Sequence, residues 1–268
     1  MSLVVCPTPI GNLEDVTLRV LSALREADVI ACEDTRRTGT LLDRYGVRAK
    51  LVSYHEHNEE RRSGELVERM QAGETVALVS DAGMPLVSDP GYVLVRACVA
   101  AGIGVEVLPG PSAAIAALVA SALPADSWRF VGFLPRKKGE LRRVLDEPGG
   151  TLVAFESPRR VPATLAVLAD LDGDRRAAVC RELTKVHEEV LRGTARELAD
   201  RFSGSPPKGE VVLVIGPPTQ EAVGADEPEG LEQLRRLVEA GAKPRPAATA
   251  VAELTGASAN DLYRALTA

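Results

Sequence analysis

The chain has 268 residues, a formal net charge of −6, 45% hydrophobic residues and 26% charged residues. This length accommodates two domains of ordinary size, and the composition is that of a globular protein. No apolar run approaches the roughly 20 residues that a membrane helix needs, and no basic region or cleavage site precedes the first apolar run. We therefore expect a cytoplasmic protein without a membrane partner, and the negative charge argues against non-specific binding to polyanions.

In chain order, apolar runs alternate with amphipathic segments as far as residue 122. Helix periodicity and short apolar runs predict helices over 15–27, 56–71, 91–101 and 113–121, and strands over 2–6, 29–32, 50–54, 75–79 and 105–108. A further helix is expected to open at Asp34, which has the side chain of an N-cap. This alternation predicts an α/β domain with a largely parallel sheet.

The pattern restarts after residue 122 and predicts a second α/β domain. Its expected strands cover 129–133, 151–155, 177–180, 189–192 and 210–215, and its helices cover 138–145, 158–170 and 194–202. An acidic, Gly- and Pro-rich linker and then only helical patterns follow, at 231–239, 247–254 and 260–266. The last two have helix-turn-helix spacing, although a packed helical hairpin is the better interpretation. The predicted domains are 1–122, 123–216, a linker at 217–230 and a helical extension at 231–268.

The segment from Ser80 to Gly91 follows an apolar run and carries two carboxylates, Asp81 and Asp89. Loops of this composition at the carboxyl end of a strand bind ligands in α/β proteins, because the turn frees backbone polar groups from the sheet. The same residues are also ordinary in strand-to-helix connections, so both interpretations stay open at this point.

Several common sites are absent from the sequence. It contains no P-loop and no G-x-S-x-G elbow, and Gly102-Ile-Gly104 precedes a strand instead of following one. Nothing in the spacing favours a triad of Ser80, His55 and Asp81 over chance. With His55 and His57 as the only close pair of ligand-type residues, no metal site is expected. The separated cysteines are expected to be reduced and mostly buried: Cys6, Cys32, Cys98 and Cys180.

Basic residues occur in short clusters, and a local basic surface can bind RNA even in an acidic protein. Each cluster by itself is more ordinarily a solvated helix face. The clusters are Arg36-Arg37, Arg61-Arg62, Arg136-Lys137-Lys138 with Arg142-Arg143, and Arg159-Arg160. The residue pattern thus predicts two α/β domains with a ligand held between them, and it leaves the identity of the ligand open.

Ordered motifs carry the interpretation further. They are Pro7-Thr-Pro9-Ile-Gly11-Asn-Leu-Glu-Asp15-Val-Thr-Leu-Arg19, Glu33-Asp-Thr-Arg36, Ser80-Asp-Ala-Gly83-Met-Pro-Leu-Val87-Ser-Asp-Pro-Gly91, Leu108-Pro-Gly-Pro-Ser112-Ala, Phe130-Val-Gly-Phe133-Leu-Pro-Arg136, Glu156-Ser-Pro-Arg-Arg160, Arg181-Glu-Leu-Thr-Lys185 and Gly209-Glu-Val. Together they resemble the tetrapyrrole methylase superfamily, in its branch of ribosomal RNA small-subunit methyltransferases. The resemblance extends from the first strand to Ile215.

This resemblance implies a two-domain tetrapyrrole methylase-like fold of α/β class, a homodimer, and S-adenosylmethionine bound between the domains. It further implies methyl transfer to the ribose 2′-hydroxyl of a cytidine in the decoding region of 16S rRNA, either free or in the small subunit. The positions that match the family's cofactor site are Pro9, Ser80, Asp81, Ala82, Gly83, Met84, Val87, Ser112, Ala113, Phe155, Leu183 and Gly209.

A sulfonium is an activated methyl donor, so the enzyme chiefly has to align the reactants, and a base would help to deprotonate the hydroxyl. Our candidates for proton handling are Glu33, Asp34 and Lys185, although capping and ion pairing explain these residues about equally well. Asp81 is expected to shape the cofactor loop. Because aromatic residues make up only 3% of the chain, RNA is expected to meet mainly basic side chains. They are Arg36, Arg37, Arg136, Lys137, Lys138 and Arg160.

Two other functions remain open. A carbon methyltransferase acting on a tetrapyrrole would share the fold and the cofactor, although the Thr8-Pro-Ile-Gly-Asn12 opening resembles the RNA branch. A non-catalytic RNA-binding or ribosome assembly protein would instead use the terminal helices.

Overall fold

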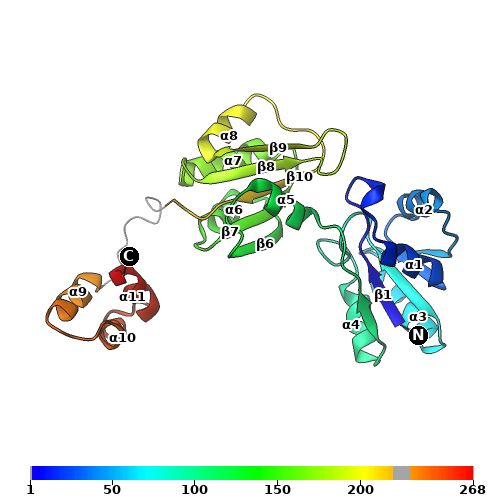
Figure 1. The fold of residues 1–268 in the computed structure, drawn as a ribbon, viewed down its shortest axis with the longest axis horizontal. Coiled ribbons are helices and arrows are strands. Elements are labelled where there is room, and N and C mark those ends of the chain that lie inside the picture. The colour runs from blue at the N-terminus through cyan, green and yellow to red at the C-terminus, as the bar shows by residue number, and fades with distance from the viewer. Residues whose placement is uncertain (1, 220–229, 268) are drawn as a thin grey trace. The chain divides into compact units, whose positions relative to one another are not determined.

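A computed structural model describes residues 2–219 and 230–267. The chain divides into two compact units, Met1–Pro217 and Pro218–Ala268, and each is described by itself. The first unit contains two five-stranded sheets, and the second contains three helices (Figure 1). Residues 220–229 of the expected acidic linker lie outside the described part of the chain. The division of the α/β region at residue 122 stays a prediction.

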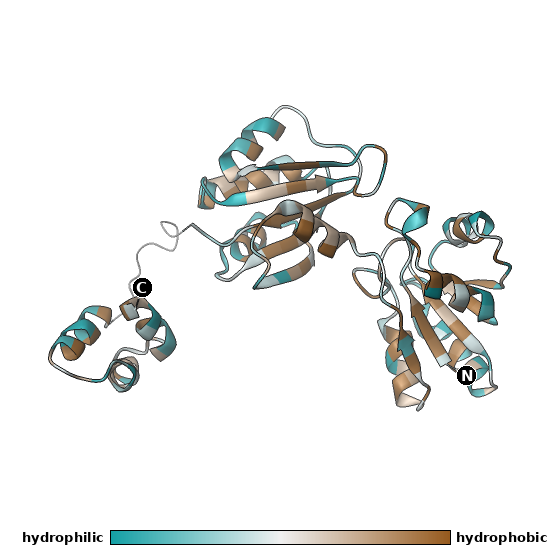
Figure 2. Cartoon of the chain, in the orientation of Figure 1, coloured by the Kyte–Doolittle hydropathy of each residue, from teal (hydrophilic) through white to brown (hydrophobic). Residues whose placement is uncertain are grey.

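The first sheet has the strand order β3-β2-β4-β1-β5, and all of its strand pairs are parallel. Its strands are β1 (Ser2–Cys6), β2 (Val29–Cys32), β3 (Leu51–Ser53), β4 (Thr75–Val79) and β5 (Val105–Val107). After a polar first residue in β1 and β4, the central strands are apolar and buried to their ends, as expected for a sheet covered on both faces (Figure 2). The predicted parallel sheet is therefore confirmed.

Helices cover both faces of this sheet. One face packs against α1 (Leu18–Glu26) and α2 (Thr35–Arg44), and the other against α3 (Glu59–Gln71) and α4 (Tyr92–Ala100). The predicted start of the first helix at Asp15 is wrong, because Leu13–Asp15 form a separate 3-10 turn. The hydroxyl of Thr17 then accepts a hydrogen bond from the Val20 N–H and caps α1. Asp34 caps α2 as predicted, by accepting from the Arg36 N–H.

The second sheet has the order β6-β7-β10-β8-β9, and only the β6–β7 pair is parallel. Its strands are β6 (Trp128–Phe133), β7 (Thr151–Glu156), β8 (Arg176–Arg181), β9 (Glu189–Thr194) and β10 (Val211–Ile215). One face carries α6 (Lys138–Asp146), α7 (Val161–Leu171) and α8 (Ala195–Phe202). The other face packs against α5 (Ala113–Ser121), which precedes the sheet in the chain.

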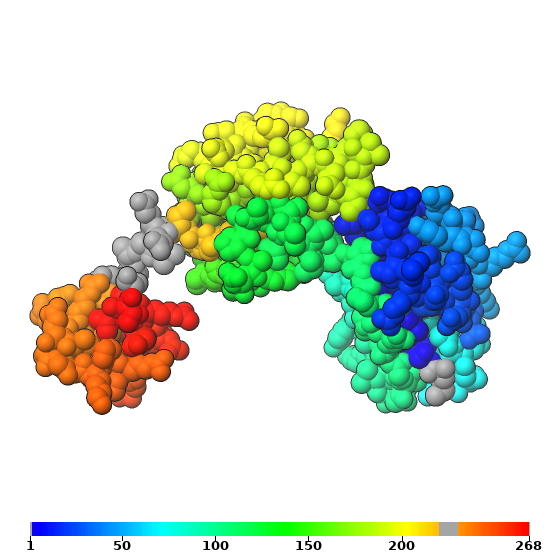
Figure 3. All heavy atoms as spheres, viewed as in Figure 1, coloured from blue at the N-terminus to red at the C-terminus, as the bar shows by residue number. Residues whose placement is uncertain are grey.

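The second unit consists of α9 (Leu231–Glu239), α10 (Pro244–Thr255) and α11 (Ala259–Thr267). These helices form a compact body around their own small core, which includes Leu234, Val251 and Leu262 (Figure 3). Gly256 ends α10 in a left-handed conformation, so the predicted turn between the last two helices is confirmed. Among the described residues, no helix combines the length and apolarity needed to cross a membrane.

The four cysteines are free and buried, as the sequence predicted. Burial raises the pKa of the thiols of Cys98 and Cys180 to about 11 in each case. These thiols are therefore protonated at neutral pH and poor nucleophiles.

The loop after β1 packs closely against the loop after β8, and this contact generates a stability prediction. A Cβ atom at Gly11 would lie 2.5 Å from Cγ of Lys185 and 2.9 Å from the carbonyl oxygen of Leu183. We expect Gly11→Ala to lower the melting temperature, because forced displacement of packed atoms costs about 1–3 kcal/mol. Gly39→Ala in α2 is the control: a Cβ there meets nothing within 4 Å, and alanine favours a helix. Equal melting temperatures for Gly11→Ala and the wild type would contradict this packing.

Candidate functional site

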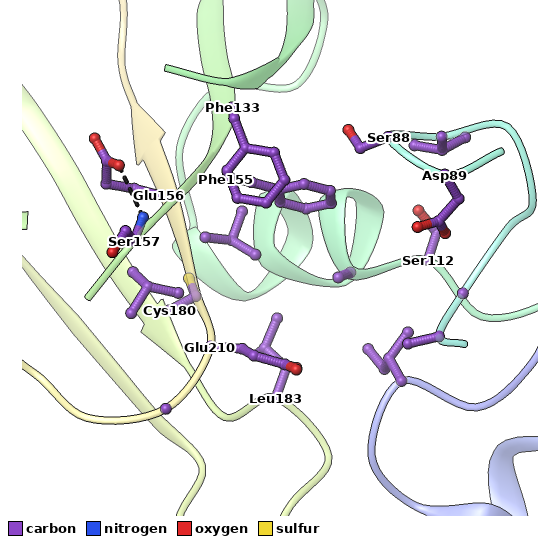
Figure 4. A pocket seen from close by; sticks show the side chains of 18 of the residues that line it. Ser88, Asp89, Ser112, Phe133, Phe155, Glu156, Ser157, Cys180, Leu183 and Glu210 are labelled. Carbon is purple, nitrogen blue, oxygen red and sulfur yellow. Dashed lines mark hydrogen bonds between the residues drawn. The ribbon is translucent and has the colours of Figure 1, made fainter. Parts of the chain in front are cut away.

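A cavity of about 380 Å³ opens where loops of the first sheet meet the second sheet. Strands β4, β1 and β5 are neighbours, so their carboxyl ends bring together loops that are distant in the sequence. Figure 4 shows Asp89 and Ser112 on one side of the cavity, and Phe155 and Leu183 on the other. The first-sheet loops supply Ile10, Ala82, Gly83, Met84, Val87, Ser88, Asp89 and Ser112.

Hydrogen bonds between the loops after β1 and β4 hold this side of the cavity. The Thr8 N–H donates to the Gly83 carbonyl at 2.8 Å, and the Gly83 N–H donates to the Thr8 carbonyl at 2.9 Å. The Thr8 hydroxyl donates to the Ser80 carbonyl at 2.9 Å, and the Ser80 hydroxyl donates to the Gly83 carbonyl at 3.0 Å. The main chain of Gly83 is thus engaged within the protein, and a ligand meets a cradle that is already shaped.

The second sheet supplies a mostly apolar wall that includes Phe155, Cys180, Leu183 and Val212. Gly209 at its edge has φ +86°, and a Cβ there would lie 2.4 Å from Cδ of Glu182. Glycine is therefore required at this position, both for the backbone conformation and for the close approach. The carboxylate of Glu182 in turn accepts a hydrogen bond from the Glu210 N–H at 2.9 Å.

Most of the residues expected to hold a cofactor line this single cavity. Those that line it are Ala82, Gly83, Met84, Val87, Ser112, Ala113, Phe155, Leu183 and Gly209. Pro9, Ser80 and Asp81 do not line it. Pro9 and Ser80 are buried, and the Asp81 carboxylate accepts from the Asp34 N–H at the start of α2.

Other lining residues were not among the positions expected to hold the cofactor. Most of them stand in the motifs quoted above: Ile10, Ser88, Asp89, Phe133, Glu156, Ser157, Pro158, Glu210 and Val211. Cys180 and Val212 lie in buried strands outside those motifs and have the pattern of core residues, so the sequence held no signal for them.

Three carboxylates form an acidic cluster at the carboxyl ends of β2 and β4: Glu33, Asp81 and Asp89. Burial raises the pKa of Asp89 to about 6, and the charges of Glu33 and Asp81 add to that rise. Burial and the charge of Asp81 also raise the pKa of Glu33. Asp81 is fixed by the Asp34 N–H, which donates to it at 3.0 Å, and by Arg37 at 3.6 Å.

Asp34 and Lys185, two of the proton-handling candidates, are both engaged in ion pairs. Hydrogen bonds from Arg36 hold the pKa of Asp34 well below its usual value, which makes it a weak base. Burial lowers the pKa of Lys185, but the carboxylates of Glu182 and Glu210, each 2.9 Å from Nζ, outweigh burial and raise it. Lys185 therefore carries a proton at neutral pH. Within the described residues, no hydrogen bond or ion pair joins Lys185 to Glu33 or Asp34.

The expected RNA-binding residues separate into three groups. Arg36 and Arg37 lie at the start of α2, where they pair with Asp34 and Asp81 respectively. Arg160 is half-buried, and its guanidinium donates to the carbonyls of Leu134 and Pro135, so it is occupied within the protein. Arg136, Lys137 and Lys138 form the third group; they are exposed, as Arg36 and Arg37 are, and they lie where β6 is joined to α6.

In the described ranges, 2–219 and 230–267, no group of three or more His, Cys, Asp or Glu side chains could hold a metal ion. The described residues of the site form an apolar wall, a shaped loop and a cluster of carboxylates.

Comparisons with known proteins bear on this site. Residues 2–199 match the family described as Tetrapyrrole (Corrin/Porphyrin) Methylases. A protein of Mesorhizobium japonicum named Ribosomal RNA small subunit methyltransferase I is 48% identical over 264 residues, covering 97% of this chain and 89% of its own length. A protein of the same name from Halalkalibacterium halodurans is 43% identical over 263 residues, covering 96% of this chain and 91% of its own.

Among solved structures, the Uroporphyrin-III C-methyl transferase of Thermus thermophilus, complexed with S-adenyl homocysteine, is similar with a TM-score of 0.58. The similarity covers 83% of this chain and 99% of that one at 21% sequence identity, so it shows the fold alone. The family match extends over most of the chain, and the relatives are similar over nearly its full length. This chain therefore belongs to the tetrapyrrole (corrin/porphyrin) methylase family.

Proposed function

We propose that this protein is an S-adenosylmethionine-dependent methyltransferase of small-subunit ribosomal RNA, which methylates the ribose 2′-hydroxyl of a cytidine in the decoding region of 16S rRNA. The observation that carries the proposal is 48% identity, over 97% of the chain, to a relative named for methylation of this RNA. The ribose target and the nucleotide rest on the finer resemblance of the motifs.

The cavity fits this cofactor in size and in chemistry. Its apolar wall suits an adenosine group, and the acidic Asp89 suits a cation such as a sulfonium. The residues that would hold the cofactor are those of the 82–84 loop, Ser112 and Ala113 on one side, and Phe155, Leu183 and Gly209 on the other. When bound, the cofactor supplies a methyl group already activated on sulfur, so the protein mainly has to position and shield the acceptor.

Proton removal from the acceptor hydroxyl falls to the acidic cluster. Asp89 lines the cavity, and a carboxylate with a pKa of about 6 is both ionised at neutral pH and basic enough to accept a proton. Glu33, whose pKa is also raised, stands behind Asp89 as a second member of the cluster. Lys185 remains protonated, and its role is structural. Its ion pairs with Glu182 and Glu210 hold together the two loops that pack at Gly209.

RNA would be bound by the exposed cations near the cavity. Arg136, Lys137 and Lys138 follow directly on the strand that contributes Phe133 to the cavity, and phosphate contacts of this kind fix the position of a nucleic acid. Arg36 and Arg37 supply a second basic position beside the acidic cluster.

A second copy of the chain is the proposed protein partner. Ile115 and Val119, one turn apart on α5, are 46% and 76% exposed, and we infer that a second copy covers them. We propose a cytoplasmic homodimer built from the two lobes 1–122 and 123–216, with the helices after residue 230 as an extension.

The function is tested with labelled S-adenosylmethionine and three acceptors: the small ribosomal subunit, free 16S rRNA and a tetrapyrrole precursor. We expect label in the RNA, and we expect alkaline hydrolysis to leave one phosphodiester bond intact, on the 3′ side of the methylated nucleotide, because a 2′-O-methyl group removes the attacking hydroxyl. Label in the tetrapyrrole, or in a base and not a ribose, would overturn the proposal.

Asp89→Asn removes the carboxylate and keeps the size of the side chain. We expect methyl transfer to fall by roughly 10²- to 10⁴-fold, the usual contribution of a general base, while S-adenosylhomocysteine still binds. In the wild type, the rate should fall as pH decreases through about 6, because protonation removes the base. The pKa of Asp89 in the folded protein is raised from 3.8, so protonation of Asp89 stabilises the fold as the pH falls. The expected loss of rate at low pH is therefore not caused by unfolding that follows protonation of Asp89.

The exposed Asp126, on the connection before β6, provides the control for Asp89. Asp126→Asn should keep the wild-type rate and pH profile. An Asp89→Asn enzyme with the wild-type rate would exclude Asp89 as the base and leave Glu33 to be tested by Glu33→Gln.

The double variant Arg136→Gln with Lys138→Gln tests the RNA surface. We expect weaker RNA binding and a shallower dependence of log affinity on log salt, by roughly 0.7–0.9 for each phosphate contact removed, with unchanged cofactor affinity. Arg48→Gln with Lys50→Gln is the control of equal charge, because these exposed residues precede β3 at the opposite end of the first sheet. Equal RNA affinity for both double variants across a salt series would contradict this surface.

A further inference from the structure

Phe133 is an exposed aromatic residue at the cavity. Phe133 is 64% exposed, and its side chain lines the cavity beside Phe155 (Figure 4). The ring centroids of Phe133 and Phe155 are 5.5 Å apart, and those of Phe130 and Phe155 are 4.9 Å apart. Three of the 4 phenylalanines in the chain thus lie together at one wall of the cavity. Of these three, Phe133 has most of its surface exposed.

A backbone irregularity directs Phe133 toward the cavity. In a regular strand, residues 130 and 133 point to opposite faces of the sheet. The β6–β7 pairing shifts register between Phe130 and Phe133, and Gly132 in this bulge has φ +64°. Both phenylalanines consequently contact the same ring, that of Phe155. Bulges near functional sites commonly redirect a side chain in this way.

The segment behind Phe133 is fixed to a buried carboxylate. Nη1 and Nη2 of Arg160 donate to the carbonyls of Leu134 at 3.1 Å and Pro135 at 2.5 Å. The same guanidinium lies 3.4 Å from Glu156, whose side chain is 0% exposed. Glu156 also accepts from the Thr164 hydroxyl at 2.7 Å. Arg160 therefore clamps the two residues that join Phe133 to the basic segment 136–138.

An exposed ring followed within five residues by three exposed cations has the composition of a site for single-stranded nucleic acid. Such sites combine stacking of bases on aromatic rings with contacts to the phosphates. Stacking is also the means by which proteins hold bases that have left a helix. Phe155 and Leu183 are less exposed than Phe133, so they form the deeper wall, and Phe133 lies where a larger substrate has access.

We propose that Phe133 stacks on an unpaired base of the RNA substrate next to the reacting ribose, and that Arg160 is the positioning residue that holds Phe133 and the basic segment in register. The proposal rests on the proposed function and adds a specificity-determining residue to it. From the sequence, Arg160 was expected to contact RNA directly. We propose instead that Arg160 acts on RNA binding indirectly, by holding the segment that carries Phe133.

The stacking role is tested by comparing Phe133→Leu with Phe133→Trp in steady-state transfer to the small subunit. We expect Phe133→Leu to raise KM for the RNA substrate by roughly 5- to 150-fold, the usual effect of losing one base–aromatic stack. Phe133→Trp should restore KM to near the wild-type value, and both variants should bind S-adenosylhomocysteine as the wild type does. Trp128→Leu is the control, since Trp128 is a partly exposed aromatic at the other end of β6.

Two outcomes would overturn the stacking role. An unchanged KM for Phe133→Leu would exclude it, and a weaker affinity for S-adenosylhomocysteine at unchanged KM would assign the ring to the cofactor's adenine instead. Failure of the proposed function is distinguishable from both, because the wild-type protein itself would then not label the RNA.

The clamp is tested with Arg160→Lys and Arg160→Gln, measured well below their melting temperatures. We expect both to raise KM for RNA with little change in kcat or cofactor affinity, and Arg160→Lys to have the smaller effect, because lysine keeps the charge that faces Glu156. Arg159→Gln is the matched control, since Arg159 is the exposed neighbour. If Arg159→Gln raised KM as much as Arg160→Gln did, the effect would be one of surface charge and the clamp would be excluded.

Discussion

The loop that follows the first strand is the constraint on which the site depends. On one side, Thr8 exchanges two main-chain hydrogen bonds with Gly83 and shapes the loop after β4. On the other side, Ile10 packs into the apolar cluster of the second sheet, and the Asn12 N–H donates to the Thr184 hydroxyl at 3.0 Å. One short loop therefore joins both walls of the cavity. Close packing at Gly11 leaves it little freedom to move.

Electrostatics gives the two walls different chemical roles. The first-sheet wall gathers carboxylates; burial raises the pKa values of Glu33 and Asp89, and the repulsion between the carboxylates adds to that rise. The second-sheet side carries Lys185 between two carboxylates, which keeps it protonated. The acidic wall suits a cationic methyl donor, and it also suits the acceptor hydroxyl that we propose, which has to lose a proton. The supporting ion pairs on the other side shape the cavity without reacting.

The motifs in the sequence located most of the cavity, because the residues after strands β1, β4 and β5 have compositions that set them apart from core and helix. They did not distinguish residues that line the cavity from residues that support it. Ser80 and Asp81 have the side chains of a binding loop, yet the Ser80 hydroxyl donates to the Gly83 carbonyl of its own loop, and the Asp81 carboxylate accepts from the Asp34 N–H. Arg160 looks like an RNA contact, and its guanidinium is occupied by two carbonyls. Such assignments depend on which side chains meet, and spacing along the chain does not encode that.

The sequence by itself determined the fold class, the strands and the family, because hydrophobic periodicity and ordered motifs are local properties of the chain. Only the tertiary structure decided the roles of individual side chains. It made β2 and β4 neighbours, so that the loop with Asp81 and Asp89 lies near Glu33, and burial together with these two charges raises the pKa of Asp89. It also introduced the bulge at Gly132 that turns Phe133 toward the cavity. Both effects arise from contacts between segments far apart in the chain, where burial, charge and strand register are set.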